Sequence, residues 1–231
     1  MLYLLTNIGA WLGIALLMGL AVWMDYKNIK QISILAITLT SFLVALSVLL
    51  TNLISYSVPF FGFGGIRLAL GNFLIFVVGM LFGPFLGVLS GIATDLLGSM
   101  INIAGSYHGG FTLNLVLYGF VGSLAFLFQA KKLWYLNAII FYTLTFMVIS
   151  FGLNTLWLYS IGWNSVVVGS AFIVKLIKFP IEMLIYIPLA LGTFSLLYKL
   201  ITAKNNMLLW CTKHGELYFK RTRDNKYPIV N

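Results

Sequence analysis

The chain has 231 residues, of which 61% are hydrophobic and only 8% are charged. Soluble domains carry about 25% charged residues, so this composition leaves too little polar surface for a water-soluble globule. The net charge of +9 does not indicate nucleic acid, because the basic residues stand in short clusters between long apolar stretches, as in cytoplasmic loops of membrane proteins. The single cysteine, Cys211, excludes an intrachain disulfide.

Seven apolar stretches follow one another along the chain, and we interpret each as a membrane helix or part of one. The first has no basic residue before it and no small-residue cleavage pattern, which predicts a retained helix rather than a signal peptide. The third is short and meets the fourth at Gly83-Pro84, which predicts a tight helical hairpin because proline is tolerated at a helix start. The predicted spans are Leu2–Met24, Ile32–Tyr56, Leu68–Phe82, Pro84–Ile103, Phe111–Phe128, Leu133–Ser160 and Val166–Tyr198.

The distribution of lysine and arginine predicts the orientation of these spans. Eleven of the fourteen basic residues lie between spans one and two, between spans five and six, or after the last span. The positive-inside rule makes those places cytoplasmic, with the N-terminus outside a plasma membrane. We predict three parts: an extra N-terminal transmembrane helix (1–26), a substrate-binding membrane core (27–200) and a basic cytoplasmic tail (201–231) with too few apolar residues to fold alone.

Small residues recur at four-residue spacing in two of the spans. Such spacing lets the backbones of membrane helices approach closely. Two interpretations stay open: packing inside this chain, or a docking face for another membrane protein. The residues are Gly79, Gly83, Gly87 and Gly91 in one series, and Ser41 and Ala45 in the other.

Charged residues inside the spans need a partner or a cavity. Asp95 lies about eleven residues, or about 17 Å, into its span. Glu182 is four residues beyond Lys178, so these two can pair along one helix face. Lys175 and Arg67 are then the positive groups without an obvious partner nearby in the sequence. Either Asp95 neutralises one of them, or they attract an anionic ligand from outside.

Several polar and aromatic residues map to the outer half of the bundle on different elements. The segment from Gly105 to Asn114 combines glycines with an aromatic ring, an imidazole and hydroxyl or amide donors. That mixture suits a flat heteroaromatic ligand held by stacking and a few hydrogen bonds. Taken singly, an interfacial aromatic such as Tyr107 or Trp163 is more often a membrane anchor. The convergence of this segment with Asn154, Trp157 and the two cations is what favours a ligand site.

These motifs carry a resemblance to a known family. The run from Gly79 to Gly98, with its Gly-Pro break and Asp95, resembles the core signature of S-components, the substrate-binding subunits of energy-coupling factor (ECF) transporters. The segment 105–113 and Asn154-Thr155-Leu156-Trp157-Leu158 are similar to motifs of the folate-specific group. Here His108-Gly109 stand where that group commonly has Phe-Pro, Lys175 stands where arginine is expected, and the first span is extra to the pattern.

The resemblance implies an all-α, polytopic transmembrane bundle with a six-helix core plus one extra N-terminal helix. It further implies a non-enzymatic subunit that captures folate or a reduced folate and joins a membrane coupling protein and two ATPase subunits. No phosphate-binding loop of the GxxxxGK[ST] type is present, and no cofactor, metal or nucleic acid is expected. The expected substrate-binding residues are Arg67, Tyr107, His108, Phe111, Thr112, Asn114, Asn154, Trp157 and Lys175, and the expected partner contacts are Ser41, Ala45, Gly87 and Gly91.

Three alternatives stay open. The same fold could carry another vitamin, such as riboflavin or a pyrimidine precursor, which the His108-Gly109 pair favours. An autonomous channel or transporter is disfavoured because no inverted repeat is visible. A lipid-active membrane enzyme is disfavoured because Asp95 and Glu182 are the only carboxylates in the spans, and no titratable pair has acid–base or metal-ligand spacing.

Overall fold

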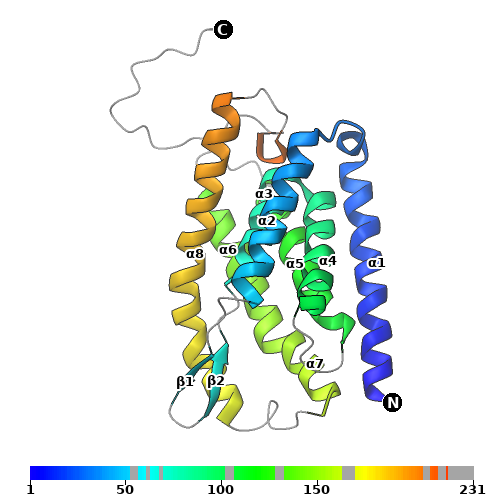
Figure 1. The fold of residues 1–231 in the computed structure, drawn as a ribbon, viewed down its shortest axis with the longest axis vertical. Coiled ribbons are helices and arrows are strands. Elements are labelled where there is room, and N and C mark those ends of the chain that lie inside the picture. The colour runs from blue at the N-terminus through cyan, green and yellow to red at the C-terminus, as the bar shows by residue number, and fades with distance from the viewer. Residues whose placement is uncertain are drawn as a thin grey trace.

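The computed structural model describes residues 1–52, 57–60, 63–67, 70–101, 107–127, 133–162, 170–204, 209–212 and 217. Within them the chain forms a bundle of long helices with a short β-hairpin at one end (Figure 1). The predicted helical membrane bundle is confirmed. Its helices are α1 (Leu2–Ile29), α2 (Ile34–Asn52), α3 (Asn72–Phe82), α4 (Pro84–Ile101), α5 (Gly109–Leu124), α6 (Trp134–Met147), α7 (Asn154–Ser160) and α8 (Ser170–Lys204).

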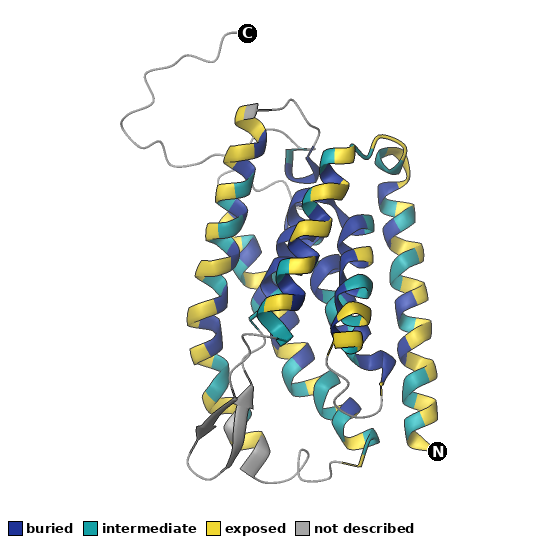
Figure 2. Cartoon of the chain, viewed as in Figure 1, coloured by how far each residue is buried: buried dark blue, intermediate teal, exposed yellow. Residues whose placement is uncertain are grey.

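Five helical stretches are long and apolar enough to cross a membrane: Leu2–Ile29, Ile34–Asn52, Pro84–Ile101, Trp134–Ser160 and Lys175–Ala203. The fourth is continuous because the π-helical segment η1 (Val148–Leu153) joins α6 to α7. Exposed apolar side chains cover the outer faces of α1, α2 and α8, and buried residues gather on the inner helices (Figure 2). Apolar outer faces of this kind are suited to contact with the hydrocarbon core of a bilayer.

Helix α3 is the centre of the bundle. It has 11 residues, too few to cross the bilayer at 1.5 Å per residue, and every residue from Phe73 to Phe82 is buried. A helix that is apolar all round belongs in an interior. The predicted tight break follows at Gly83, where φ is +94° and Pro84 starts α4.

The glycine series packs inside the chain. A Cβ added at Gly79 would lie 1.9 Å from the carbonyl oxygen of Gly119, and one at Gly87 would lie 2.5 Å from the same atom. Gly91 is equally close to the backbone of α5, where its Cβ would lie 2.6 Å from the Val116 nitrogen. These glycines therefore bring α3 and α4 against α5, as small residues do between membrane helices.

Two terminal regions pack more closely than the sequence predicts. Helix α1 lies along α4 and α5, where Ile14 and Ala21 pack with Val88 and Val116. After α8, the 3-10 turn η3 (Trp210–Thr212) packs into the opposite end of the bundle from the N-terminus (Figure 1). The Trp210 indole donates to the Ser123 carbonyl oxygen at 2.9 Å. The start of the predicted tail is thus part of the core.

The segment Ser57–Arg67, which lies between the second and third predicted spans, contains two strands. Strands β1 (Ser57–Phe60) and β2 (Phe63–Arg67) pair antiparallel with Ser57 opposite Arg67. A strand of alternating pattern is hard to recognise in so short a glycine-rich stretch. Strand β2 contacts α8.

Candidate ligand-binding site

The predicted binding residues gather at the end of the bundle that holds the N-terminus, α7, the β-hairpin and the start of α8 (Figure 1). Five of them belong to two hydrogen-bonded networks, and Lys175 supplies a cation. The side chain of Arg67 lies outside the described part of the chain. Arg67 ends β2, the strand that contacts α8. Trp163 and residues 102–106 lie outside the described part of the chain.

The first network joins Tyr107, Thr112 and Asp95. The Thr112 hydroxyl donates to Asp95 Oδ2 at 2.6 Å, and its oxygen also bonds the Tyr107 hydroxyl. Because the Thr112 proton is directed to the carboxylate, the phenol must donate to Thr112. Partial burial and then the nearby Asp95 charge raise the pKa of Tyr107, which keeps it a donor at neutral pH. The carboxylate of Asp95 is thus held by the hydroxyl of Thr112 on α5. The sequence alone did not predict this partner for Asp95.

The second network joins Trp157, Asn114 and Asn154. The indole Nε1 of Trp157 donates to Asn114 Oδ1 at 3.1 Å, and Asn114 Nδ2 donates to Asn154 Oδ1 at 3.2 Å. The indole packs on the first turn of α5, where a Cβ at Gly110 would lie 2.4 Å from the ring. Segment η1 comes directly before Asn154, and π-helical turns of this kind rotate the following residues relative to a regular helix.

His108 lies at the start of α5, where it contacts both Thr6 on α1 and Trp157 on α7. Its side chain is fully buried, and Nδ1 accepts the Gly110 N–H at 2.9 Å, which makes it the N-cap of α5. Its Nε2 lies 3.1 Å from the Thr6 hydroxyl oxygen, and its ring centroid lies 5.3 Å from that of Trp157. Since Nδ1 is an acceptor, the neutral ring carries its proton on Nε2. Burial lowers the pKa of His108 and favours this neutral form.

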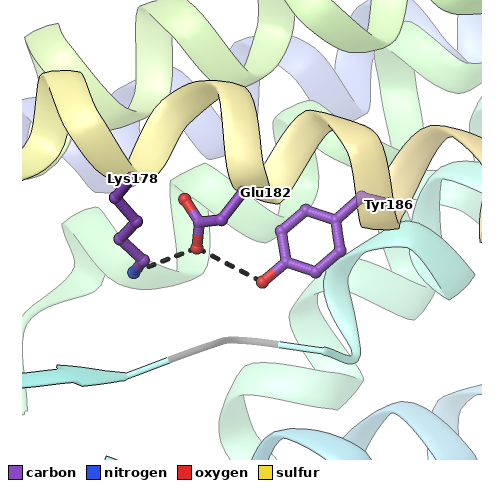
Figure 3. A network of polar contacts seen from close by, with 3 residues as sticks. All are labelled: Lys178, Glu182 and Tyr186. Carbon is purple, nitrogen blue, oxygen red and sulfur yellow. Dashed lines mark hydrogen bonds and ion pairs between the residues drawn. The ribbon is translucent and has the colours of Figure 1, made fainter. Parts of the chain in front are cut away.

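The cations of α8 have different surroundings. Lys178 pairs with Glu182 at 3.0 Å, which confirms the predicted i, i+4 pair, and Tyr186 donates to the same carboxylate at 3.3 Å (Figure 3). Lys175 is half-buried, and its Nζ donates to the Thr155 hydroxyl at 2.7 Å. A neutral hydroxyl leaves the Lys175 charge available to an anion.

Other polar residues of the interior escaped the sequence analysis. Tyr118, Tyr142 and Tyr186 are almost completely buried. Among the described residues, Tyr142 Oη has no hydrogen-bond partner. Because aromatic residues are common in this apolar sequence, the spacing of these tyrosines does not predict that their hydroxyls lie in the interior. The described part of the chain contains no group of three or more His, Cys, Asp or Glu side chains that could hold a metal ion.

The predicted partner contacts separate into two groups. Gly87 and Gly91 are buried against α5 and have no surface to offer another protein. Ser41 and Ala45 are exposed on the outer face of α2. Of the four predicted contacts, only Ser41 and Ala45 are exposed.

Fold and site together define a multi-span helical membrane protein with a polar site at one end. The chain is similar to the folate transporter FolT of Clostridium novyi (strain NT), with 29% identity over 151 residues that cover 63% of this chain and 81% of that protein. This match confirms the predicted resemblance to the folate-specific S-components. No family model matches the chain, and no solved structure is a significant match.

Proposed function

We propose that this chain captures folate, or a reduced folate, outside the cell as the substrate-binding subunit of an ECF importer. The observation that carries the proposal is the convergence of the Tyr107–Thr112 and Asn114–Asn154 networks with Lys175 at one end of the bundle, in a chain similar to a folate transporter. The positive-inside rule assigns this end to the outside of the cell.

The proposed chemistry follows from the groups that the site offers. The Lys175 ammonium group donates to the neutral Thr155 hydroxyl, so its charge can attract a glutamate carboxylate of the cargo. Arg67, at the end of β2, assists it. Lysine acts as a point charge, without the two-pronged geometry of arginine. Tyr107 and Phe111 stack on the flat rings, and Asn154 recognises their polar edges. Thr112 is fully buried and serves this site by holding Tyr107 and Asp95 in place.

The experiment is equilibrium binding of folic acid and 5-formyltetrahydrofolate to detergent-purified protein, followed by tryptophan quenching and checked by calorimetry. We expect tight binding that weakens strongly in Arg67→Ala, Lys175→Ala and Trp157→Ala. Lys199→Ala, an exposed lysine near the other end of α8, is the matched control and leaves binding unchanged. Folded wild-type protein that binds neither compound refutes the folate assignment.

A second cargo class has one observation in its favour. His108-Gly109 stand where the folate group commonly has Phe-Pro, and the His108 ring lies beside Trp157, with the ring centroids 5.3 Å apart. A competition panel that includes riboflavin and pyrimidine vitamins separates the two readings. Displacement of folate only by other folates supports the first, and preferential binding of another vitamin supports the second.

The proposed partners are a membrane coupling protein and two ATPase subunits, with the exposed Ser41–Ala45 face of α2 as the docking surface. The measurement is folate uptake in cells that carry or lack the ATPase subunits. Loss of uptake with retained binding by the purified chain supports ATP-driven import. Undiminished uptake without the ATPases indicates an autonomous transporter instead.

A further inference from the structure

The extra helix α1 contacts three consecutive residues of the candidate site. The Tyr3 hydroxyl donates to the carbonyl oxygen of Tyr107 at 2.7 Å. The Thr6 hydroxyl lies 3.1 Å from His108 Nε2, and Asn7 Oδ1 accepts the N–H of Gly109 at 2.8 Å. Tyr3, Thr6, Asn7 and Trp11 are spaced three, one and four residues apart, which places them on one face of the helix.

These contacts are specific rather than general packing. Polar groups within a membrane protein are costly unless paired, and the polar groups of Tyr3, Thr6 and Asn7 each pair with the segment Tyr107–Gly109. The segment also fits closely against α1 at Gly109, because a Cβ there would lie 2.8 Å from Trp11 Nε1 and 2.9 Å from Asn7 Oδ1. A proline at position 109 would also lack the N–H that Asn7 accepts.

The contacts lead into both networks of the site. Tyr107 is hydrogen-bonded to Thr112, which donates in turn to Asp95. His108 caps α5, packs on Trp157 and lies 3.4 Å from the Ser160 hydroxyl. A shift of the segment at α1 therefore moves the groups that face the cargo.

We infer that α1 is a positioning element of the ligand-binding site. Its face of Tyr3, Thr6 and Asn7 holds the segment Tyr107–Gly109 in the geometry that binds the cargo. The helix thereby contributes to ligand affinity and is more than a membrane anchor. This inference rests on the proposed function for the identity of the cargo. The contacts of Tyr3, Thr6 and Asn7 with the segment Tyr107–Gly109, which we call the clamp, do not depend on it.

The test uses the full-length protein with Asn7→Leu, which removes the acceptor at similar volume, and the milder Tyr3→Phe. Hydrogen exchange of the peptide containing residues 107–111 is measured without cargo, and cargo affinity and dissociation rate are measured in parallel. We expect exchange in this segment to accelerate and affinity to fall roughly five- to tenfold, the effect of one lost hydrogen bond. We expect melting temperatures to fall by only a few degrees, because one lost hydrogen bond is a small part of the stability of a chain of this length.

Two controls separate positioning from general stability. Thr6→Val removes the hydroxyl beside His108 and weakens binding, and Thr6→Ser restores it. Thr38→Val removes an exposed hydroxyl on α2 that bonds only its own helix backbone, at Ile34, and leaves affinity unchanged.

The outcomes are distinguishable from those of the folate test. If wild-type protein does not bind folate, the same variants are measured with whichever vitamin the competition panel identifies. Unchanged exchange at 107–111 in Asn7→Leu and Tyr3→Phe overturns the clamp. Faster exchange with unchanged cargo affinity shows a structural brace and overturns the positioning role.

Discussion

His108 and Trp157 illustrate, at the scale of single residues, how polar groups inside this bundle are satisfied. Each side chain is buried and pairs with groups on other elements: His108 with Thr6 on α1, and Trp157 with Asn114 on α5. In a low-dielectric interior an unpaired polar group is expensive, so each pair is coupled to the position of the elements that carry it.

The first prediction concerns pH. The folded-state pKa of His108 lies below its unfolded value of about 6.5. Its contribution to stability is therefore complete above that value and is lost as the pH falls below it, because the unfolded chain takes up the proton first. Protonation would also place a hydrogen on Nδ1, which accepts the Gly110 N–H. We expect the melting temperature to fall between pH 7.5 and 5.5.

The control for this prediction is His108→Asn, which keeps an N-cap acceptor and cannot titrate. It should flatten the pH dependence over that range. His214→Gln replaces the only other histidine of the chain and should leave the wild-type dependence intact. An equal acid loss in His108→Asn would assign the effect to other groups.

The second prediction concerns Trp157→Phe. The substitution keeps an aromatic ring but removes the donor to Asn114, whose side chain is buried. The unpaired amide oxygen should cost about 1–3 kcal/mol of stability, and cargo affinity should fall as Asn114 and Asn154 reorient. Thermal unfolding and cargo titration measure the two effects. Trp23→Phe changes a tryptophan exposed on α1 and should alter neither; equal effects in both variants would contradict the assignment.

At the scale of elements, the glycines of α3, α4 and α5 decide how closely the central helices pack. A Cβ at Gly119 would lie 2.0 Å from the carbonyl oxygen of Gly87, so both helices run backbone against backbone. This close approach holds α5 in place, and α5 carries Thr112 and Asn114 into the site.

The third prediction follows for Gly119→Ala. The added methyl group meets backbone on α4 and cannot be relieved by a side-chain rotation, so the helices must separate. We expect a loss of about 3 kcal/mol or more, the upper end for overpacking, measured by thermal unfolding in detergent. Gly9→Ala, with nothing within 4 Å of the new Cβ, should be neutral or slightly stabilising. Similar stability of the two variants would show that α4 and α5 do not pack in this way.

At the scale of the whole molecule, the two ends of the bundle differ in structure. One end gathers the site, and the opposite end is closed by η3, whose Trp210 packs beside Gly83. Ser41 and Ala45 are exposed on the outer face of α2, where no helix within the described residues covers them. A large protein can approach closely there because both side chains are small.

The fourth prediction is that Ala45→Trp abolishes uptake and co-purification with the coupling protein while cargo binding by the isolated chain is unchanged. The indole would prevent close approach of a partner helix but touches nothing in the site. Leu184→Trp, on the exposed face of α8, is the matched control and should transport normally. Normal transport by Ala45→Trp would place the docking surface elsewhere.

The sequence by itself determined the membrane bundle, the position of every long helix, the break at Gly83-Pro84 and the Lys178–Glu182 pair. These features depend on composition, on hydrophobic length and on neighbours three or four residues apart, so they can be read locally. The motifs at 105–113 and 154–158 also located the candidate site, because their polar residues stand out in an apolar chain.

Only the tertiary structure decided which groups pair within that site. Asp95 accepts a hydrogen bond from Thr112. The fully buried His108 pairs with Thr6, which lies 102 residues earlier in the chain. Periodicity carries no information about such distant contacts. In a membrane interior any donor or acceptor within reach can satisfy a polar group, so the choice among them is made by the packing of the helices.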